Sequence, residues 1–266
     1  MTITFLDQEP IIVSRRKLVQ GLAAGSIVAV AGCVKNQAIG RDQLILVSEG
    51  QIAQMASASW TALKRQTKVS NDRTLNRRLQ NVGGKIVQTA GLQNQPWEFT
   101  VFDDDQANAF VLPGGKVGFY TGIFKRMKND NHLATVMGHE VGHVTARHAA
   151  ERYSQQVAAG VATTAAAVAL EAGDVRGGAE IAGILGLGVQ FGILLPYSRR
   201  HELEADRLGI NYMHRAGYDA RQSLDFWNAM SSQRTGAPPP EFMSTHPSDA
   251  TRKAAIRQEL QRLGLA

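Results

Sequence analysis

Two histidines and one glutamate stand at a spacing that suits a metal site, in the His-Glu-Val-Gly-His run of residues 139–143. Positions four apart share one face of an α-helix, so His139 and His143 can direct ring nitrogens at one ion. Glu140 lies at the edge of that face, where its carboxylate can take a proton from a water on the ion. The pattern therefore predicts a zinc site with two imidazole ligands and a general base.

The surrounding residues indicate that this site lies on a packed helix rather than in a loop. Residues 131–152 are expected to form one amphipathic helix with a buried apolar side. The residues of that side are Leu133, Val136, Met137, Val141 and Val144. Gly138 and Gly142 are poor helix formers that would let another segment approach closely. A helix can carry two histidines for solvation alone, but the buried side favours the metal site.

A second charged run supplies a candidate third ligand. Catalytic zinc needs three protein ligands and a fourth position for water. Residues 197–213 are helix-compatible, and within them Glu202 is the candidate ligand. Asp206 shares its face and would accept the other N–H of a ligand histidine, which fixes the orientation of that ring. Glu204 faces elsewhere. Without the first motif, this helix would be an ordinary solvated face.

Composition bounds the class of protein. The chain has 266 residues, 44% of them hydrophobic and 20% charged, which is typical of a globular domain with a sizeable core. The net charge of +6 is mild, and no basic block with interleaved aromatic residues is present, so nucleic-acid binding is not expected. The single cysteine excludes an intrachain disulfide and a multi-thiolate metal site.

The first residues resemble a bacterial targeting segment. A basic run at 14–17 precedes a mostly apolar run at 18–32, which ends at Cys33 in a sequence similar to a lipobox. The alternative is a short buried or membrane helix, but glycine and glutamine interrupt the run and it is short for a span. The paired arginines also resemble a twin-arginine signal, so the export route stays open.

The resulting division of the chain has three parts. Residues 1–32 are expected to be a lipoprotein signal peptide, 33–43 a polar tether behind a lipid on Cys33, and 44–266 one domain. The sequence predicts helices at 44–68, 72–91 and 218–234, a final helix ending at 263, and strands at 97–102, 109–112 and 116–120. An extended substrate could add itself as a strand along the edge of that small sheet.

Three further segments have competing interpretations. The acidic residues 103–105 are more readily explained as a solvated hairpin turn than as a calcium site. The apolar stretches 157–170 and 181–195 are each shorter than the roughly 20 residues of a spanning helix. A packed helical hairpin is the simpler explanation for them. A mobile cover over the cleft, or a surface that touches a membrane, is the alternative.

The combined motifs resemble the HtpX, BepA and LoiP group of zinc metallopeptidases, metallopeptidase family forty-eight. The residues that carry the resemblance are His139, Glu140, His143, Ser198, Arg199, Glu202, Asp206, the run 108–115 and Thr245-His246-Pro247. The resemblance implies an α+β, mainly helical gluzincin fold with a small sheet beside the active-site helix, one zinc ion, and Glu202 as third ligand. It also implies that the His246 loop reaches the cleft. There the imidazole would occupy the open zinc position in a latent enzyme, or its cation would stabilise an oxyanion.

These expectations combine into one function. A zinc-bound water would attack a peptide bond with Glu140 as general base, so residues 44–266 would be a zinc endopeptidase domain. The resemblance implies substrates among misfolded, damaged or misassembled envelope proteins on the periplasmic side of a bacterial envelope, with a link to outer-membrane assembly. The lipobox-like sequence implies a lipid anchor, and Val34 after Cys33 favours the outer membrane because it does not resemble an inner-membrane retention signal. The alternative is a latent or non-catalytic chaperone for outer-membrane proteins. Arg252 is a lesser oxyanion candidate, and the remaining histidines, 132, 148, 201 and 214, are expected to be surface or satisfied residues.

Overall fold

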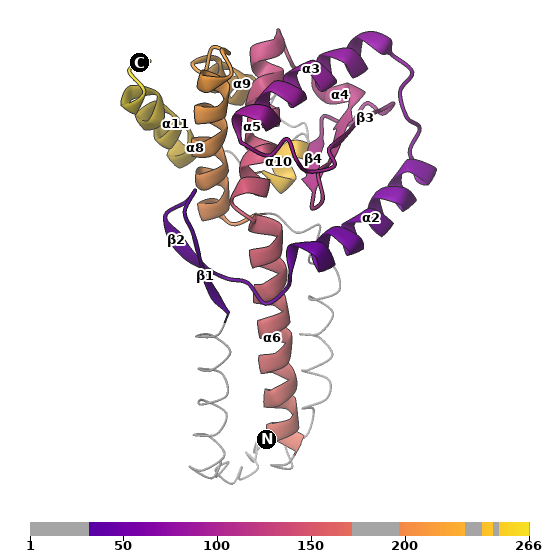
Figure 1. Ribbon diagram of the computed structural model, residues 1–266, viewed down its shortest axis with the longest axis vertical. Helices are drawn as coiled ribbons and strands as arrows, with labels where there is room; N and C mark the ends of the chain where they lie inside the picture. Colours follow the sequence, from indigo (N-terminus) through magenta and orange to yellow (C-terminus); the bar gives the residue numbers. More distant parts are fainter. Residues whose placement is uncertain (1–31, 172–196, 232–240, 247–249, 266) are drawn as a thin grey trace, which may run out of the picture.

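The computed structural model describes residues 32–171, 197–231, 241–246 and 250–265 (Figure 1). The described part is mainly helical, with a small sheet, as predicted. Helix α5 (Asp130–Thr145) stands between α8 (Arg199–Arg215) on one side and α3 (Arg73–Thr89) with the sheet on the other. The remaining helices are α2 (Glu49–Gln66), α4 (Thr121–Phe124), α6 (His148–Glu171), α9 (Gln222–Ser231), α10 (Glu241–Thr245) and α11 (Ala250–Arg262).

The predicted helices outside the active site have side-chain caps or apolar faces that explain them. Asp72 caps α3 by accepting hydrogen bonds from the backbone amides of Thr74 and Leu75, at 2.8 and 3.0 Å. The buried side of α3 packs on the sheet and on α5. Helix α9 begins at Gln222, four residues later than predicted, because Asp219 and Arg221 form a local turn before it.

The three predicted strands form one sheet with the order β3-β5-β4. Strand β3 (Glu98–Phe102) runs parallel to β5 (Lys116–Tyr120), and β4 (Ala109–Leu112) pairs antiparallel with β5. Because β3 and β4 are not neighbours, the prediction of a hairpin turn at residues 103–105 is wrong. This acidic segment is the start of a crossover, and Lys68 and Lys125 form ion pairs with Asp103 and Asp105.

The helix that carries the histidine motif ends earlier than predicted. Residues 131–152 are not one helix, because α5 ends at Thr145 and α6 begins at His148. Arg147 between them has a φ of 54°, in the left-handed region that ends an α-helix. Its guanidinium donates to Glu49 at 2.6 Å. Neither glycine nor proline stands at this break, so the sequence carries no signal for it.

The polar segment after Cys33, which was predicted as a tether, forms a hairpin packed on the domain. Strands β1 (Cys33–Asn36) and β2 (Arg41–Leu44) form an antiparallel hairpin that turns at Gly40, where φ is 72°. Polar side chains of the hairpin find hydrogen-bond partners at the junction of α5 and α6, which is why a polar sequence packs here. The segment therefore belongs structurally to the domain.

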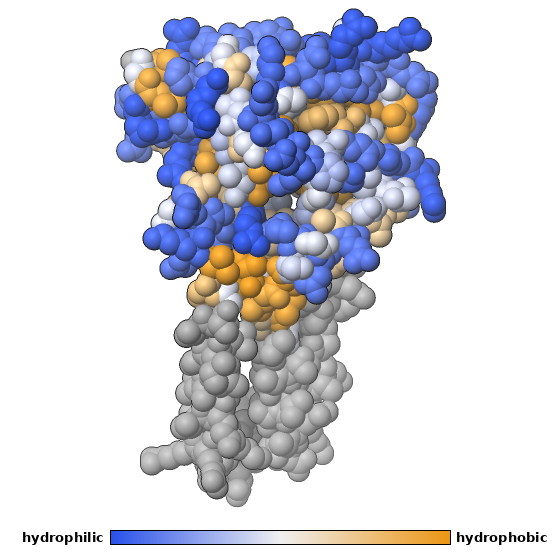
Figure 2. All heavy atoms as spheres, viewed as in Figure 1, coloured by the Kyte–Doolittle hydropathy of each residue, from blue (hydrophilic) through white to orange (hydrophobic). Residues whose placement is uncertain are grey.

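Two predicted segments lie outside the described residues. They are the signal peptide up to residue 31 and the apolar stretch 181–195. Among the described helices, none is both long and apolar enough to cross a membrane. Figure 2 shows apolar residues gathered around α6 on this face, while the upper part of the face is mainly hydrophilic.

Candidate active site

The site is built where α5 crosses α8 at very short distance. A Cβ placed on Gly142 would lie 2.6 Å from the carbonyl oxygen of Ala205, and one on Gly138 would lie 2.9 Å from that of Gly209. Only glycine allows two helix backbones to approach so closely. The crossing brings the histidine face of α5 against Glu202 and Asp206 of α8.

Four buried side chains converge at this crossing. His139, His143, Glu202 and His246 each offer one ligand atom, and these atoms lie within 4.8 Å of one another. The Nε2 atoms of His139 and His143 are 3.1 Å apart, and each lies 3.4 Å from a carboxylate oxygen of Glu202. His246 Nδ1 lies 3.0 Å from His139 Nε2 and 3.1 Å from Glu202 Oε1.

This donor set fits a zinc ion. Imidazole nitrogens and a carboxylate oxygen are the usual ligands of zinc, and four of them can surround it as a tetrahedron. Nitrogen lone pairs that face one another at about 3 Å in a buried site repel unless a cation or a proton lies between them. The sequence-predicted ligands His139, His143 and Glu202 are thus brought together, and His246 joins them as a fourth donor.

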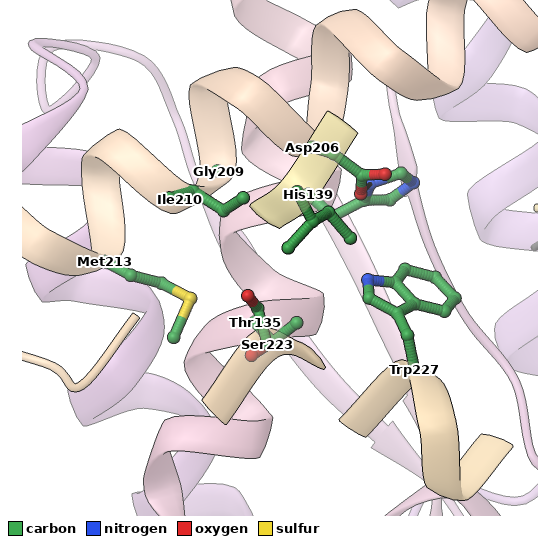
Figure 3. Close-up of a pocket in the computed structure, with 9 residues that line it drawn as sticks. Thr135, His139, Asp206, Gly209, Ile210, Met213, Ser223 and Trp227 are labelled. Carbon is green, nitrogen blue, oxygen red and sulfur yellow. Dashed lines mark hydrogen bonds and ion pairs between the residues drawn. The ribbon is translucent and has the colours of Figure 1, made fainter. Parts of the chain in front are cut away.

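A buried ion-pair network contacts the candidate ligands from the side away from the cluster. Asp206 Oδ1 lies 2.8 Å from His139 Nδ1, so the nitrogen that faces the cluster is Nε2. Arg252 is 1% exposed and donates to both oxygens of Asp206, at 2.6 and 2.7 Å, and to Glu202 Oε2 at 2.7 Å. Figure 3 shows Asp206 beside the His139 ring, with the indole of Trp227 next to them.

The electrostatics of the site favour a bound cation. Burial disfavours the charged form of Glu202, but His246, His139 and Arg252 outweigh it and hold its pKa well below the ordinary value. Burial is the leading cause that lowers the pKa of His143. For His139 burial acts the same way, but Glu202 and Asp206 raise its pKa to about 9. An ionised Glu202 and a neutral His143 are the forms that bind metal, and His139 would release its proton to a metal ion that binds.

Glu140 lies beside the cluster in a different environment. It is 1% exposed, and its Oε1 atom has no hydrogen-bond partner among the described residues. Burial raises its pKa, against the opposing influence of His246 and His139 and a hydrogen bond with the backbone of Val111 in β4. His246 Nε2 lies 3.5 Å from Glu140 Oε1. Because buried carboxylate oxygens are normally hydrogen-bonded, this atom is suited to accept a proton from a bound molecule.

Sequence comparison identifies the family. Residues 73–260 match Peptidase family M48. The chain belongs to this family of metallopeptidases. It is 36% identical over 177 residues to mitochondrial metalloendopeptidase OMA1 of Schizosaccharomyces pombe, a match that covers 66% of this chain and 50% of that protein. It is 30% identical over 222 residues to the beta-barrel assembly-enhancing protease of Escherichia coli, covering 82% of this chain and 45% of that protein. The chain therefore spans about half the length of these two relatives.

Membership in family M48 agrees with the fold, which is of the zincin type, and with the clustered ligands. Two features of the site were not predicted. Arg252 was an oxyanion candidate, but its guanidinium binds Asp206 and Glu202 and acts on the ligands instead. His148 was expected to be a surface or satisfied histidine; it is buried and partnered by Glu204, and its Nδ1 also lies 2.8 Å from that of His143. Only the position of His148 just beyond the motif could have drawn attention to it.

Proposed function

We propose that this protein is a zinc-dependent endopeptidase. The observation that carries the proposal is the convergence of His139, His143 and Glu202 beside the buried carboxylate of Glu140. A structural zinc site needs ligands but no general base. The raised pKa of Glu140 suits a group that takes up a proton and later releases it.

The residues of the site divide the chemistry among themselves. His139, His143 and Glu202 would hold zinc, which supplies Lewis acidity for the peptide carbonyl and acidifies a water molecule. Glu140 Oε1 would accept a proton from the attacking water and pass it to the leaving amine. Asp206 fixes the ring of His139. Arg252 keeps the two site carboxylates ionised and in place.

The resting state is proposed to be latent. His246 Nδ1 points into the ligand cluster, and His246 is only 2% exposed. Helix α10, which leads to it, docks through a 3.0 Å hydrogen bond from the Phe242 amide to the carbonyl of Ala107, just before β4. The same segment would therefore occupy the fourth ligand position and restrict the approach to the edge strand. This observation also favours the second candidate, a latent protein that acts mainly as a binder or chaperone for outer-membrane proteins.

In the open state, β4 would receive the substrate as an added strand. Tyr120 donates to the carbonyl of Asn108 at 3.0 Å, so alternate residues from Asn108 onward bond to β5. Ala109 and Val111 therefore direct their backbone groups away from β5. Val111 is also the residue whose backbone meets Glu140. A peptide paired with the backbone groups of Ala109 and the carbonyl of Val111 would lie alongside the general base.

Substrates and location rest on the relatives and on the N-terminal sequence. The name of the Escherichia coli relative, beta-barrel assembly-enhancing protease, supports misfolded or misassembled envelope proteins as substrates and a link to outer-membrane assembly. Cys33 is exposed at the first residue of β1, where it can carry a lipid. We therefore place the protein on the periplasmic side of the bacterial envelope, anchored by lipid, with the outer membrane favoured.

Degradation of casein by the zinc-loaded protein tests the proposal. The wild type, Glu140→Gln and His246→Ala are compared at equal zinc content. The proposal predicts that Glu140→Gln cleaves nothing and that His246→Ala cleaves faster than wild type. If none of the three proteins cleaves casein although each holds one zinc, the result favours the second candidate, a protein that acts mainly as a binder or chaperone. Equal rates for wild type and Glu140→Gln would refute the role of the general base.

A further inference from the structure

A second buried polar cluster lies directly behind the metal ligands. It contains His148 and Glu151 from α6 and His201 and Glu204 from α8. The rings of His148 and His201 stack with centroids 4.3 Å apart. His148 Nε2 lies 2.9 Å from Glu204, and His201 Nε2 lies 3.2 Å from Glu151. Nothing in the proposed peptidase chemistry uses this cluster.

Arg41 of β2 joins the two carboxylates of the cluster. Its guanidinium donates to both oxygens of Glu151, at 2.6 and 2.8 Å, and to both oxygens of Glu204, at 2.7 and 2.8 Å. Hydrogen bonds to Glu204 and Glu151 raise the pKa of Arg41. Two bidentate contacts by one guanidinium fix both carboxylates in orientation as well as position. Arg41 thus occupies the space between them that a cation would need.

The rest of the hairpin is fastened to the same place. Gln43 is 2% exposed and donates to Glu151 at 2.6 Å and to the carbonyl of Ala146 at 2.7 Å. Asn36 donates to the carbonyl of Thr145 at 3.2 Å and to the Gln43 side chain at 3.0 Å. Both carbonyls belong to the end of α5, so the hairpin is hydrogen-bonded to this helix just after the ligand histidines.

Hydrogen bonding that begins at Glu204 fixes the tautomers of His148 and of the ligand His143. The carboxylate of Glu204 can only accept, so His148 must donate from Nε2. A neutral His148 then accepts at Nδ1, and the atom 2.8 Å away, His143 Nδ1, must donate. His143 is left with its lone pair on Nε2, the nitrogen that faces Glu202 and His139.

The break between α5 and α6 makes this contact possible. Because Arg147 adopts a left-handed conformation, the chain turns sharply and His148 lies against His143. In a continuous helix the two rings, five residues apart, would point in different directions. The departure from helical geometry therefore has a role at the site.

We propose that the hairpin after Cys33 is a positioning element of the metal site, in which Arg41 holds Glu204, Glu204 orients His148, and His148 orients the ligand His143. The inference rests on the proposed zinc site. It makes Arg41 a positioning residue for zinc, although it lies outside the peptidase motifs. The residue proposed to carry the lipid begins the same hairpin, and three side chains, those of Arg41, Glu204 and His148, connect this hairpin to the ligand His143.

Zinc affinity of the full chain tests the proposal. The dissociation constant is measured by competition with a chelator, and the visible spectrum of the cobalt-substituted protein reports the ligand geometry. Loss of an outer partner of a ligand histidine typically weakens metal binding by about 10–100-fold. We expect such a loss for His148→Ala and roughly a tenfold loss for Arg41→Ala. Arg41→Lys keeps the charge but cannot make the two bidentate contacts, so its zinc affinity should lie between those of Arg41→Ala and wild type.

Ser154→Ala is the matched control for a structural effect. Ser154 accepts a 2.8 Å hydrogen bond from the Leu46 amide just after β2, so its loss loosens the same segment without touching the network. It should lower the melting temperature and leave zinc affinity and the cobalt spectrum unchanged. Arg41→Ala should weaken zinc binding and change the cobalt spectrum. If Arg41→Ala does not fold, His148→Ala still tests the proposal through the same two measurements.

The outcomes separate the two proposals. If the wild type binds no zinc, the proposed function fails and this inference fails with it. If the wild type binds one zinc, and Arg41→Ala and His148→Ala bind it within twofold of wild type with the same cobalt spectrum, only the positioning role is overturned. The positioning role is also overturned if Ser154→Ala weakens zinc binding as much as Arg41→Ala does.

Discussion

Gly138 of α5 and Gly209 of α8 pack backbone against backbone. A Cβ on Gly209 would lie 2.7 Å from the carbonyl carbon of Gly138 and 2.8 Å from the amide nitrogen of His139. These contacts are with backbone, which cannot rotate away as a side chain can. The distance between the two helices, and with it the distance between the imidazole ligands and Glu202, is therefore set by glycine.

Gly209→Ala should force the helices apart and weaken both the fold and the metal site. Overpacking of this kind costs about 1–3 kcal/mol in the free energy of unfolding. Gly84→Ala is the control, because Gly84 is exposed on α3 and its added Cβ meets nothing within 4 Å. That change should stabilise the protein by roughly 0.5–1 kcal/mol. Denaturant unfolding measures the free energy of unfolding of both variants. Equal changes in Gly209→Ala and Gly84→Ala would contradict the close crossing of α5 and α8.

Arg252→Ala should be among the most destabilising single changes in the domain. It leaves Glu202 and Asp206 buried without their shared cation, and breaking a buried pair costs about 3–5 kcal/mol. The exposed Arg257 on the same helix is the control, where alanine should change stability by less than about 0.5 kcal/mol. Thermal unfolding of the zinc-free proteins compares them. A small effect at Arg252 would mean that the carboxylates are not ionised.

The lowered pKa of Glu151 predicts how the free energy of unfolding depends on pH. Burial opposes its ionisation, but hydrogen bonds from His201, Arg41 and Gln43 outweigh burial and hold its pKa well below 4.5. The unfolded chain then binds the proton more readily, so the contribution is complete above about pH 4.5 and is lost as pH falls below it. Glu151→Gln removes this dependence. The stability difference between wild type and Glu151→Gln should shrink on acidification below pH 4.5, and a constant difference would refute the assignment.

The sequence predicted most elements with strong local signals. The spacing of His139 and His143, the β-prone residues of the three strands and the helical spacing within residues 72–91 are encoded within a few residues. The left-handed Arg147 could not be predicted, because no glycine or proline marks it and only tertiary contacts hold it there. The order of the sheet was hidden for a similar reason, since pairing of β3 with β5 depends on residues far apart in the chain.

In the candidate site, too, local signals could be predicted and contacts between distant segments could not. The ligands form a motif, whereas the residues that position them come from distant segments. Arg41 and Arg252 lie at opposite ends of the domain sequence, and each holds carboxylates of α8. Polar residues in a segment that looks like a linker gave no hint that they would be buried. Residues 33–43 were therefore predicted as a tether when they form a packed hairpin.

Two buried glutamates of this site are assigned different roles, one binding zinc and the other moving a proton. The same change, carboxylate to amide, tests both when zinc content and casein cleavage are measured together. We expect Glu140→Gln to keep about one zinc per chain and Glu202→Gln to lose most of it, while neither cleaves. Loss of zinc in Glu140→Gln with full retention in Glu202→Gln would contradict the assignment.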